Sequence, residues 1–277
     1  MSRVWFITGC STGFGRCLAE QALAAGNRVV VTARQTASLE SLAEQFPETC
    51  LPLALDVTEP TQITGSVRAA LENFGRIDVL VNNAGYGLIG ALEECDADQI
   101  RRSIETNLIG PLNLIRAVLP GMRANHSGHL INLTAVAGVA NHEGFSVYGG
   151  AKFGLEGASE ALRIELAPLG IKVILIEPGP FRTDFISRSL ERGRHPIPDY
   201  DGTSGKFLRL LESLNGKQPG DPAKAADVML QLVEEAKPPF RLPLGAFAHR
   251  RIRQKLNDQI AELDAWETLG KNTDFSR

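Results

Sequence analysis

The sequence predicts an α/β fold in which a doubly wound parallel sheet of about seven strands carries helices on both faces. Short, mostly apolar, β-branched runs alternate with amphipathic stretches through the first two thirds of the chain. This alternation is typical of parallel strands that are covered on both sides. The chain has 277 residues, of which 43% are hydrophobic. It therefore suits a single domain, residues 1–277, better than two small ones.

Each element follows from a local pattern. Strand-forming runs occupy residues 4–8, 28–32, 51–55, 79–81, 129–133 and 172–176, and a seventh is expected at 240–244. Amphipathic helices are expected at 14–25, 39–46, 62–74, 99–123 and 148–167, where apolar residues recur at helical spacing. A further helix should run to Ala236, with Asp221 as its cap and Pro222 at its first position.

Residues 185–220 interrupt the alternation of strands and helices. They combine Arg188, Arg192, Arg194, Pro196 and Pro198 with several glycines and a short apolar patch at 207–214. A segment of this length is more often a binding loop or lid than a linker, so we expect a substrate lid that is weakly ordered without ligand. A C-terminal helical extension is expected at 246–268, with its basic run at 250–255 exposed to solvent.

Composition and charge argue against several classes of protein. Lysine and arginine number 29 against 32 acidic residues, for a net charge of −3, so nothing favours a nucleic-acid partner. We expect no membrane span, because no apolar run is long enough, and no signal peptide, because a strand begins at Val4. The cysteines show no CxxC pair and no zinc spacing, and no metal site is expected. These features favour a cytoplasmic protein with reduced cysteines.

A glycine-rich turn follows the first predicted strand and leads into a helix. It reads Thr8-Gly9-Cys10-Ser11-Thr12-Gly13-Phe14-Gly15. Glycines permit a tight turn and a close approach to a pyrophosphate, while the helix N-terminus offers free N–H groups and a positive dipole. The context predicts a Rossmann-type dinucleotide site that involves Gly9, Ser11, Thr12, Gly13, Phe14 and Gly15.

The end of the second predicted strand selects the cofactor. An acidic residue at this place would bind the ribose 2′-hydroxyl of NAD, whereas an arginine suits a 2′-phosphate. The chain reads Ala33-Arg34, which favours NADP(H). The alternative is an exposed arginine that only ends a strand.

Tyr148 and Lys152 lie one helical turn apart, which places their Cβ atoms about 5–6 Å from each other. A free tyrosine titrates at about pH 10 and is a poor acid or base near neutrality. A lysine cation beside it should favour the phenolate and lower the pKa of the tyrosine. The pair therefore predicts a proton-transfer device, although a Tyr and a Lys at this spacing are more often a surface pair.

Three further turns follow predicted strands: Asp56-Val57, Asn82-Asn83-Ala84-Gly85 and Pro178-Gly179. Turn chemistry alone explains each of them. Doubly wound sheets, however, bind their ligands at the carboxyl ends of their strands. Their common placement therefore predicts one site.

With these motifs in this order, residues 4–183 resemble the short-chain dehydrogenase/reductase family, in its TGxxxGxG and YxxxK group. The subgroup most similar contains the 17β-hydroxysteroid and retinol dehydrogenases. The resemblance implies that Tyr148 is the catalytic acid/base, that Lys152 bonds the nicotinamide ribose and lowers the pKa of the tyrosine, and that the Asn107 backbone holds a relay water. It also implies cofactor contacts from Asp56, Val57, Asn83, Ala84, Gly85, Pro178, Gly179, Phe181 and Thr183.

The chain departs from the family at one catalytic position. The family serine stands thirteen residues before the tyrosine, where this chain has Ala135. A methyl group cannot donate a hydrogen bond to a carbonyl, and losing one such donor commonly costs about 10²–10³ in rate. Three explanations stay open: an introduced serine-to-alanine substitution, a replacement hydroxyl (Thr134, Ser146, water or substrate), or a degenerate protein that binds NADPH without turnover.

The substrate pocket is less readable. Val136, Phe145, Phe181 and Phe185 either line an apolar pocket or belong to the core, and His142 either contacts substrate or is an exposed loop residue. The leading hypothesis is an NADP(H)-dependent ketone reductase or secondary alcohol dehydrogenase with an apolar, bulky substrate. Its rival is a non-catalytic NADPH-binding scaffold or sensor. The family resemblance also implies a homodimer or homotetramer, formed through the helices at 99–123 and 148–167.

Overall fold

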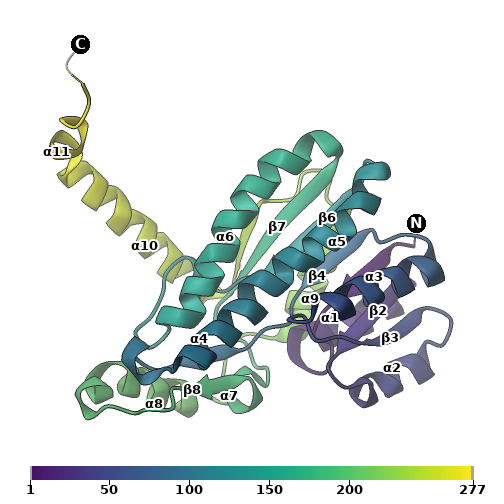
Figure 1. The fold of residues 1–277 in the computed structure, drawn as a ribbon, viewed down its shortest axis with the longest axis horizontal. Coiled ribbons are helices and arrows are strands. Elements are labelled where there is room, and N and C mark those ends of the chain that lie inside the picture. The colour runs from purple at the N-terminus through teal and green to yellow at the C-terminus, as the bar shows by residue number, and fades with distance from the viewer. Residues whose placement is uncertain (1, 276–277) are drawn as a thin grey trace.

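The central feature is one parallel sheet of seven strands, in the order β3-β2-β1-β4-β6-β7-β9 (Figure 1). The structure is a computed structural model that describes residues 2–275. The strands are β1 (Val4–Ile7), β2 (Arg28–Ala33), β3 (Cys50–Ala54), β4 (Val79–Asn82), β6 (Gly128–Leu133), β7 (Ile171–Pro178) and β9 (Arg241–Leu244). The predicted doubly wound sheet is therefore confirmed, and each strand overlaps its predicted range.

Helices cover both faces of the sheet because successive strand residues point to opposite sides. Trp5 and Ile7 of β1 pack with α1 (Gly13–Ala24), α2 (Glu40–Gln45) and α9 (Pro222–Glu234). Phe6, between them, packs on the other face with α3 (Pro60–Phe74), α5 (Gly110–Ala124) and α6 (Ser146–Leu166). The Asp221 side chain caps α9 by accepting from the Ala223 N–H, as predicted.

The helix predicted at 99–123 is not a single α-helix. It consists of α4 (Ala97–Ile104), a π turn at Glu105–Ile109, and α5. The wide turn holds Asn107, whose buried Nδ2 donates to the carbonyl oxygens of Tyr86 and Ser103. Helical periodicity does not reveal such a turn, although π turns are frequent at functional sites.

Residues 185–220 contain more regular structure than a weakly ordered lid. They include α7 (Phe185–Arg188), β8 (Leu190–Arg192) and α8 (Lys206–Ser213), and β8 pairs with β5 (Gly87–Ile89) in a second, unpredicted parallel sheet. Figure 1 places α7, β8 and α8 together at one end of the molecule. Buried Gln99 ties the segment down, because its Nε2 donates to the Glu191 carboxylate and to the Arg192 carbonyl.

The chain ends in α10 (Ala246–Ala265) and α11 (Glu267–Lys271). Ala248 and Ile252 pack α10 against Val136 and Val139, while the rest of the helix projects away from the body (Figure 1). Within residues 2–275, no helix is both long enough and apolar enough to cross a membrane. All four cysteines are free thiols.

Candidate active site

One cavity of about 1390 Å³ opens at the carboxyl ends of the strands. A ligand pocket usually measures roughly 300–1,000 Å³, so this cavity has room for a dinucleotide together with a substrate. The structure brings all the predicted catalytic, cofactor and substrate residues to its wall except Gly15. Gly15 lies beneath the glycine-rich turn instead.

The glycine-rich turn forms a cradle that leaves no room for side chains. Gly9 has a φ of 72° and lies against Ala84, and a Cβ added at Gly15 would come within 2.4 Å of the Gly9 carbonyl oxygen. Asn83 Nδ2 fixes the turn by donating to the carbonyl oxygens of Thr8 and Gly9, at 2.7 and 3.0 Å. α1 then begins with no side-chain cap and no acidic residue in its first turn. Its N–H groups can therefore bind an anion, and the cradle fits a pyrophosphate.

The end of the cavity where the sequence predicts the adenosine contacts lies beside β2 and β3. Arg34 follows β2, is exposed, and lines the cavity, whereas Ala33 before it is buried. Asp56 also lines it, but its Oδ1 accepts from both the N–H and the hydroxyl of Thr58. One oxygen of Asp56 is thus engaged in turn chemistry, as the local sequence indicated.

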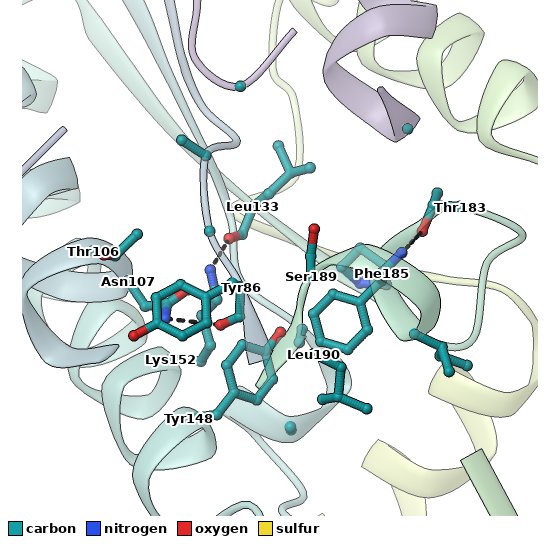
Figure 2. Close-up of a pocket in the computed structure, with 18 of the residues that line it drawn as sticks. Tyr86, Thr106, Asn107, Leu133, Tyr148, Lys152, Thr183, Phe185, Ser189 and Leu190 are labelled. Atoms are coloured by element: carbon teal, nitrogen blue, oxygen red, sulfur yellow. Dashed lines mark hydrogen bonds between the residues drawn. The ribbon is translucent and has the colours of Figure 1, made fainter. Parts of the chain in front are cut away.

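Tyr148 and Lys152 are not a surface pair, because both side chains are buried, at 6% and 5% exposure. Lys152 Nζ donates to the Leu133 carbonyl oxygen at 2.8 Å and lies 5.9 Å from the centre of the Tyr148 ring (Figure 2). Burial lowers the pKa of Lys152 to about 8, although the nearby Glu156 opposes the shift.

The tyrosine does not show the lowered pKa that the sequence predicted. Burial instead raises the pKa of Tyr148 above its ordinary value, and this expectation is wrong for the structure without ligand. The physical reason is that the phenol lies in a dry pocket, while the lysine ammonium faces the Leu133 carbonyl. The phenol is therefore protonated across the physiological range.

Asn107 lies at the floor of the site, fully buried. Its Oδ1 finds no hydrogen-bond partner among the described residues. A Cβ added at Gly85 would lie 2.7 Å from that oxygen. A side chain at position 85 would therefore collide with the π turn that holds Asn107.

Ala135 lies in an apolar wall, packed against the cluster that contains Phe145, Tyr148 and Phe207. Neither protein hydroxyl suggested as a substitute is placed to replace the missing donor. Thr134 lines the cavity, but its hydroxyl donates to Glu156 Oε1 at 2.6 Å. Ser146 is exposed and is not part of the cavity wall.

The substrate side of the cavity is aromatic. Phe145 contacts Tyr148 with ring centres 5.1 Å apart, and Phe185 approaches Tyr148 at 5.8 Å. His142 is a wall residue rather than an exposed loop histidine: it stacks on Phe207 at 4.9 Å, and burial lowers its pKa. Sequence reasoning missed several wall residues, which come from distant parts of the chain: Tyr86, Leu190, Phe207, Leu211, Leu214 and Phe247.

Behind the site, a buried carboxylate cluster surrounds Arg241. The Arg241 guanidinium pairs with Glu156 at 3.0 Å, with Glu160 at 2.6 Å and with Glu177 at 3.5 Å. Glu177 is 1% exposed, and burial raises its pKa from 4.5 to about 7, with Glu156 adding to the shift. Thr134 bonds to Glu156 and Pro178 follows Glu177, so the cluster supports two strand ends that line the cavity.

This cluster makes stability depend on pH. Because the folded pKa of Glu177 exceeds its unfolded value, the native state binds more protons between pH 4.5 and about 7, and the free energy of unfolding falls as pH rises through that window. We expect Glu177→Gln to reduce this fall, to which Glu156 still contributes because burial raises its pKa as well, and to be about 1–3 kcal/mol more stable than the parent above the window. Urea unfolding at both ends of the window measures it. Glu160→Gln, which changes an exposed partner of the same arginine, should show no such gain; an equal gain in both variants would contradict the assignment.

Within the described residues, no three or more His, Cys, Asp or Glu side chains gather where they could hold a metal ion.

Known proteins resemble the chain over nearly its whole length. A family model described as short chain dehydrogenase matches residues 3–192. Oxidoreductase BOA17 of Botryotinia fuckeliana (strain B05.10) is 39% identical over 270 residues, which cover 97% of this chain and 98% of that protein. The 3-ketodihydrosphingosine reductase of Bacteroides thetaiotaomicron is 34% identical over 248 residues, 88% of each chain.

Solved structures show the same fold. A short-chain dehydrogenase from Streptomyces avermitilis superposes with a TM-score of 0.93 and 40% identity, covering 99% of this chain and 98% of that one. A metagenomic short-chain oxidoreductase in complex with NADP gives 0.70 and 27%, over 88% and 97% of the chains. A short chain dehydrogenase/reductase from Burkholderia phymatum in complex with NAD gives 0.83 and 22%, over 94% and 95%, and this likeness concerns the fold alone.

Proposed function

Because the chain belongs to the short-chain dehydrogenase family, we propose that it is an NADP(H)-dependent oxidoreductase that interconverts an apolar, bulky ketone and its secondary alcohol. The observation that carries the proposal is the position of Tyr148. Its phenol lies in one cavity between the glycine cradle and the aromatic wall. A proton donor is thus within reach of both a dinucleotide and an apolar substrate.

The residues divide the chemistry between them. Bound NADPH supplies the hydride. Tyr148 donates a proton to the carbonyl oxygen as the alcohol forms. Lys152 and Asn107 hold the polar side of the site, where a water held by the Asn107 backbone would return a proton from solvent to the phenol, while Phe145, Phe185 and Phe207 line its apolar side.

The protonation state of the phenol favours reduction over oxidation. Burial raises the pKa of Tyr148, so the phenol is protonated and holds the proton that reduction needs, although the raised pKa makes it a weaker acid. Because the pKa of Lys152 is about 8, its amine is protonated in most copies of the protein at neutral pH. A bound cofactor that turns this cation toward the phenol would lower the pKa of the tyrosine and permit the reverse reaction.

Arg34 supports NADP(H) over NAD(H), because it is exposed at the cavity wall directly after β2, and its guanidinium suits a 2′-phosphate. We expect Arg34→Ala to raise the Kd for NADPH about 10- to 100-fold, the size of one lost charge-assisted bond. The Kd for NADH should stay nearly unchanged. Fluorescence titration with both cofactors checks this result. Equal weakening for both cofactors would contradict the 2′-phosphate assignment.

Residues 185–220 are proposed as the substrate lid, because Phe185, Leu190 and Phe207 form the outer wall of the cavity. Ties such as Gln99 to Arg192 must loosen to admit a bulky ketone. The similarity to a 3-ketodihydrosphingosine reductase supports a ketone on a long apolar chain. The cytoplasmic location and the homo-oligomer through α4, α5 and α6 stay predictions.

The rival proposal, an NADPH-binding scaffold or sensor, rests on the missing hydroxyl at Ala135. A direct experiment separates the two: NADPH oxidation is followed with a panel of apolar ketones at saturating cofactor. Slow but measurable oxidation supports the enzyme. Tight NADPH binding with no oxidation across the panel supports the scaffold.

A further inference from the structure

The apolar face of α10 continues beyond the body of the protein. Its first turns bury Ala248 and Ile252 against Val136 and Val139. The same face then carries Leu256, Ile260, Leu263 and Trp266, which are 48%, 57%, 70% and 64% exposed. Spacings of three and four residues place these side chains on one stripe. Figure 1 shows this part of the helix standing clear of the sheet and its covering helices.

A projecting helix of this kind needs a partner. An isolated helix of about a dozen residues is marginal in water, and most helices owe their stability to packing of an apolar face. The stripe is also larger than the scattered apolar residues that are normal on a monomer surface. We call residues 253–271 the C-terminal arm.

The charges of α10 are segregated along its length. Arg250, Arg251, Arg253 and Lys255 precede Leu256, the first exposed residue of the stripe, and Asp258, Glu262, Asp264 and Glu267 follow it. Within residues 2–275, the only ion pair in the arm joins Lys271 to Glu267. A basic half and an acidic half on one helix are complementary to the same helix running in the opposite direction, and repel a parallel copy.

We propose that the C-terminal arm pairs with the arm of a second copy of this chain, antiparallel and stripe to stripe. In one alignment of the two antiparallel helices, oppositely charged residues face each other on both sides of the stripe. Arg253 and Asp264 lie on one side of the stripe, and Lys255 and Glu262 lie on the other, at 3.6 residues per turn. Arg253 then faces Asp264 of the second copy, and Lys255 faces its Glu262. Both pairs share a midpoint between Asp258 and Gln259, where the two-fold axis passes.

This interface is separate from the cavity and from the α4, α5 and α6 surfaces that family resemblance implies. Where those helices form a closed assembly, the paired arms are expected to join two such assemblies and so to double the mass.

The test uses two charge-reversed full-length variants, Arg253→Glu with Lys255→Glu, and Glu262→Lys with Asp264→Lys. In each variant the four flanking positions 253, 255, 262 and 264 carry charges of one sign, and the variant should show half the mass of the parent by light scattering at micromolar concentration. When the two are mixed, their arms become complementary and the parent's mass should return. A matched control, Lys217→Glu with Lys237→Glu, changes net charge by the same amount on exposed residues elsewhere and should keep the parent's mass.

Three results would overturn the proposal. The first is a parent protein whose measured mass is no larger than that of either variant, which would show that the arms do not pair in the parent. The second is a variant pair that keeps the parent's mass unmixed. The third is a loss of mass in both variants that mixing does not restore, which would place the arm on the body of another molecule. None of these results bears on NADPH oxidation, so the outcome is distinguishable from failure of the proposed function.

Discussion

Tyr148→Phe is expected to lower the turnover of ketone reduction by about 10²–10⁴-fold, the contribution of a well-placed general acid. The change removes one oxygen from a residue that is 6% exposed and packed between Phe145 and Phe185. The aromatic wall therefore stays filled. Affinity for NADPH should change little, because the phenol serves the carbonyl oxygen. Steady-state kinetics and a cofactor titration measure the two effects separately.

Tyr200→Phe is the matched control for this prediction. Its hydroxyl is exposed and bonds Glu93, so its loss should leave turnover within about twofold of the parent, as for other surface contacts. A Tyr148→Phe enzyme that keeps the parent's turnover would show that the proton comes from another group.

Ala135→Ser is expected to raise turnover by about 10²–10³-fold, the value of one donor placed at a developing oxyanion. Position 135 is extended, with a φ of −177°, and follows β6 at the cavity wall, so a serine fits without backbone strain. The nearest competing hydroxyl, that of Thr134, is bonded to Glu156 and cannot compensate. Single-turnover oxidation of NADPH compares the two forms.

Ala135→Cys separates the hydrogen bond from the added size. A thiol fills similar space but is a weak donor, so it should recover little of the gain. An unchanged rate in Ala135→Ser would contradict the view that the methyl group limits the site. No activity in either form, with NADPH still bound, would favour the scaffold.

Local motifs predicted the sheet, and they predicted which residues of the glycine-rich turn lie at the cavity wall, apart from Gly15. The glycine-rich turn depends on residues that are adjacent in sequence, so strand, turn and helix could be read together. The packing of Gly9 against Ala84 and of Gly15 against Asn83 then follows from the fold. The position of Arg34 at the cavity wall could be predicted because the residue directly follows β2.

The substrate end depended on contacts that the sequence does not encode locally. Phe207 reaches Phe145 and His142 from more than sixty positions along the chain, and β8 pairs with β5 over only three residues. The pKa of Tyr148 was predicted with the wrong sign for the unliganded state. Sequence spacing predicts that Lys152 lies one helical turn from Tyr148. It does not predict that the phenol is buried, or that the Leu133 carbonyl accepts a hydrogen bond from the ammonium.

The most direct test of the proposed ketone reduction is to follow deuterium from the cofactor into the product. The parent chain and Ala135→Ser are incubated with NADPH deuterated at nicotinamide C4 and with an apolar ketone, and the product is analysed by mass spectrometry. We expect an alcohol that carries deuterium on the former carbonyl carbon. Ala135→Ser should form it faster than the parent, and a parallel incubation with Tyr148→Phe should form almost none. NADPH that binds to both forms yet yields no deuterated alcohol from any ketone of the panel would contradict the proposed reaction.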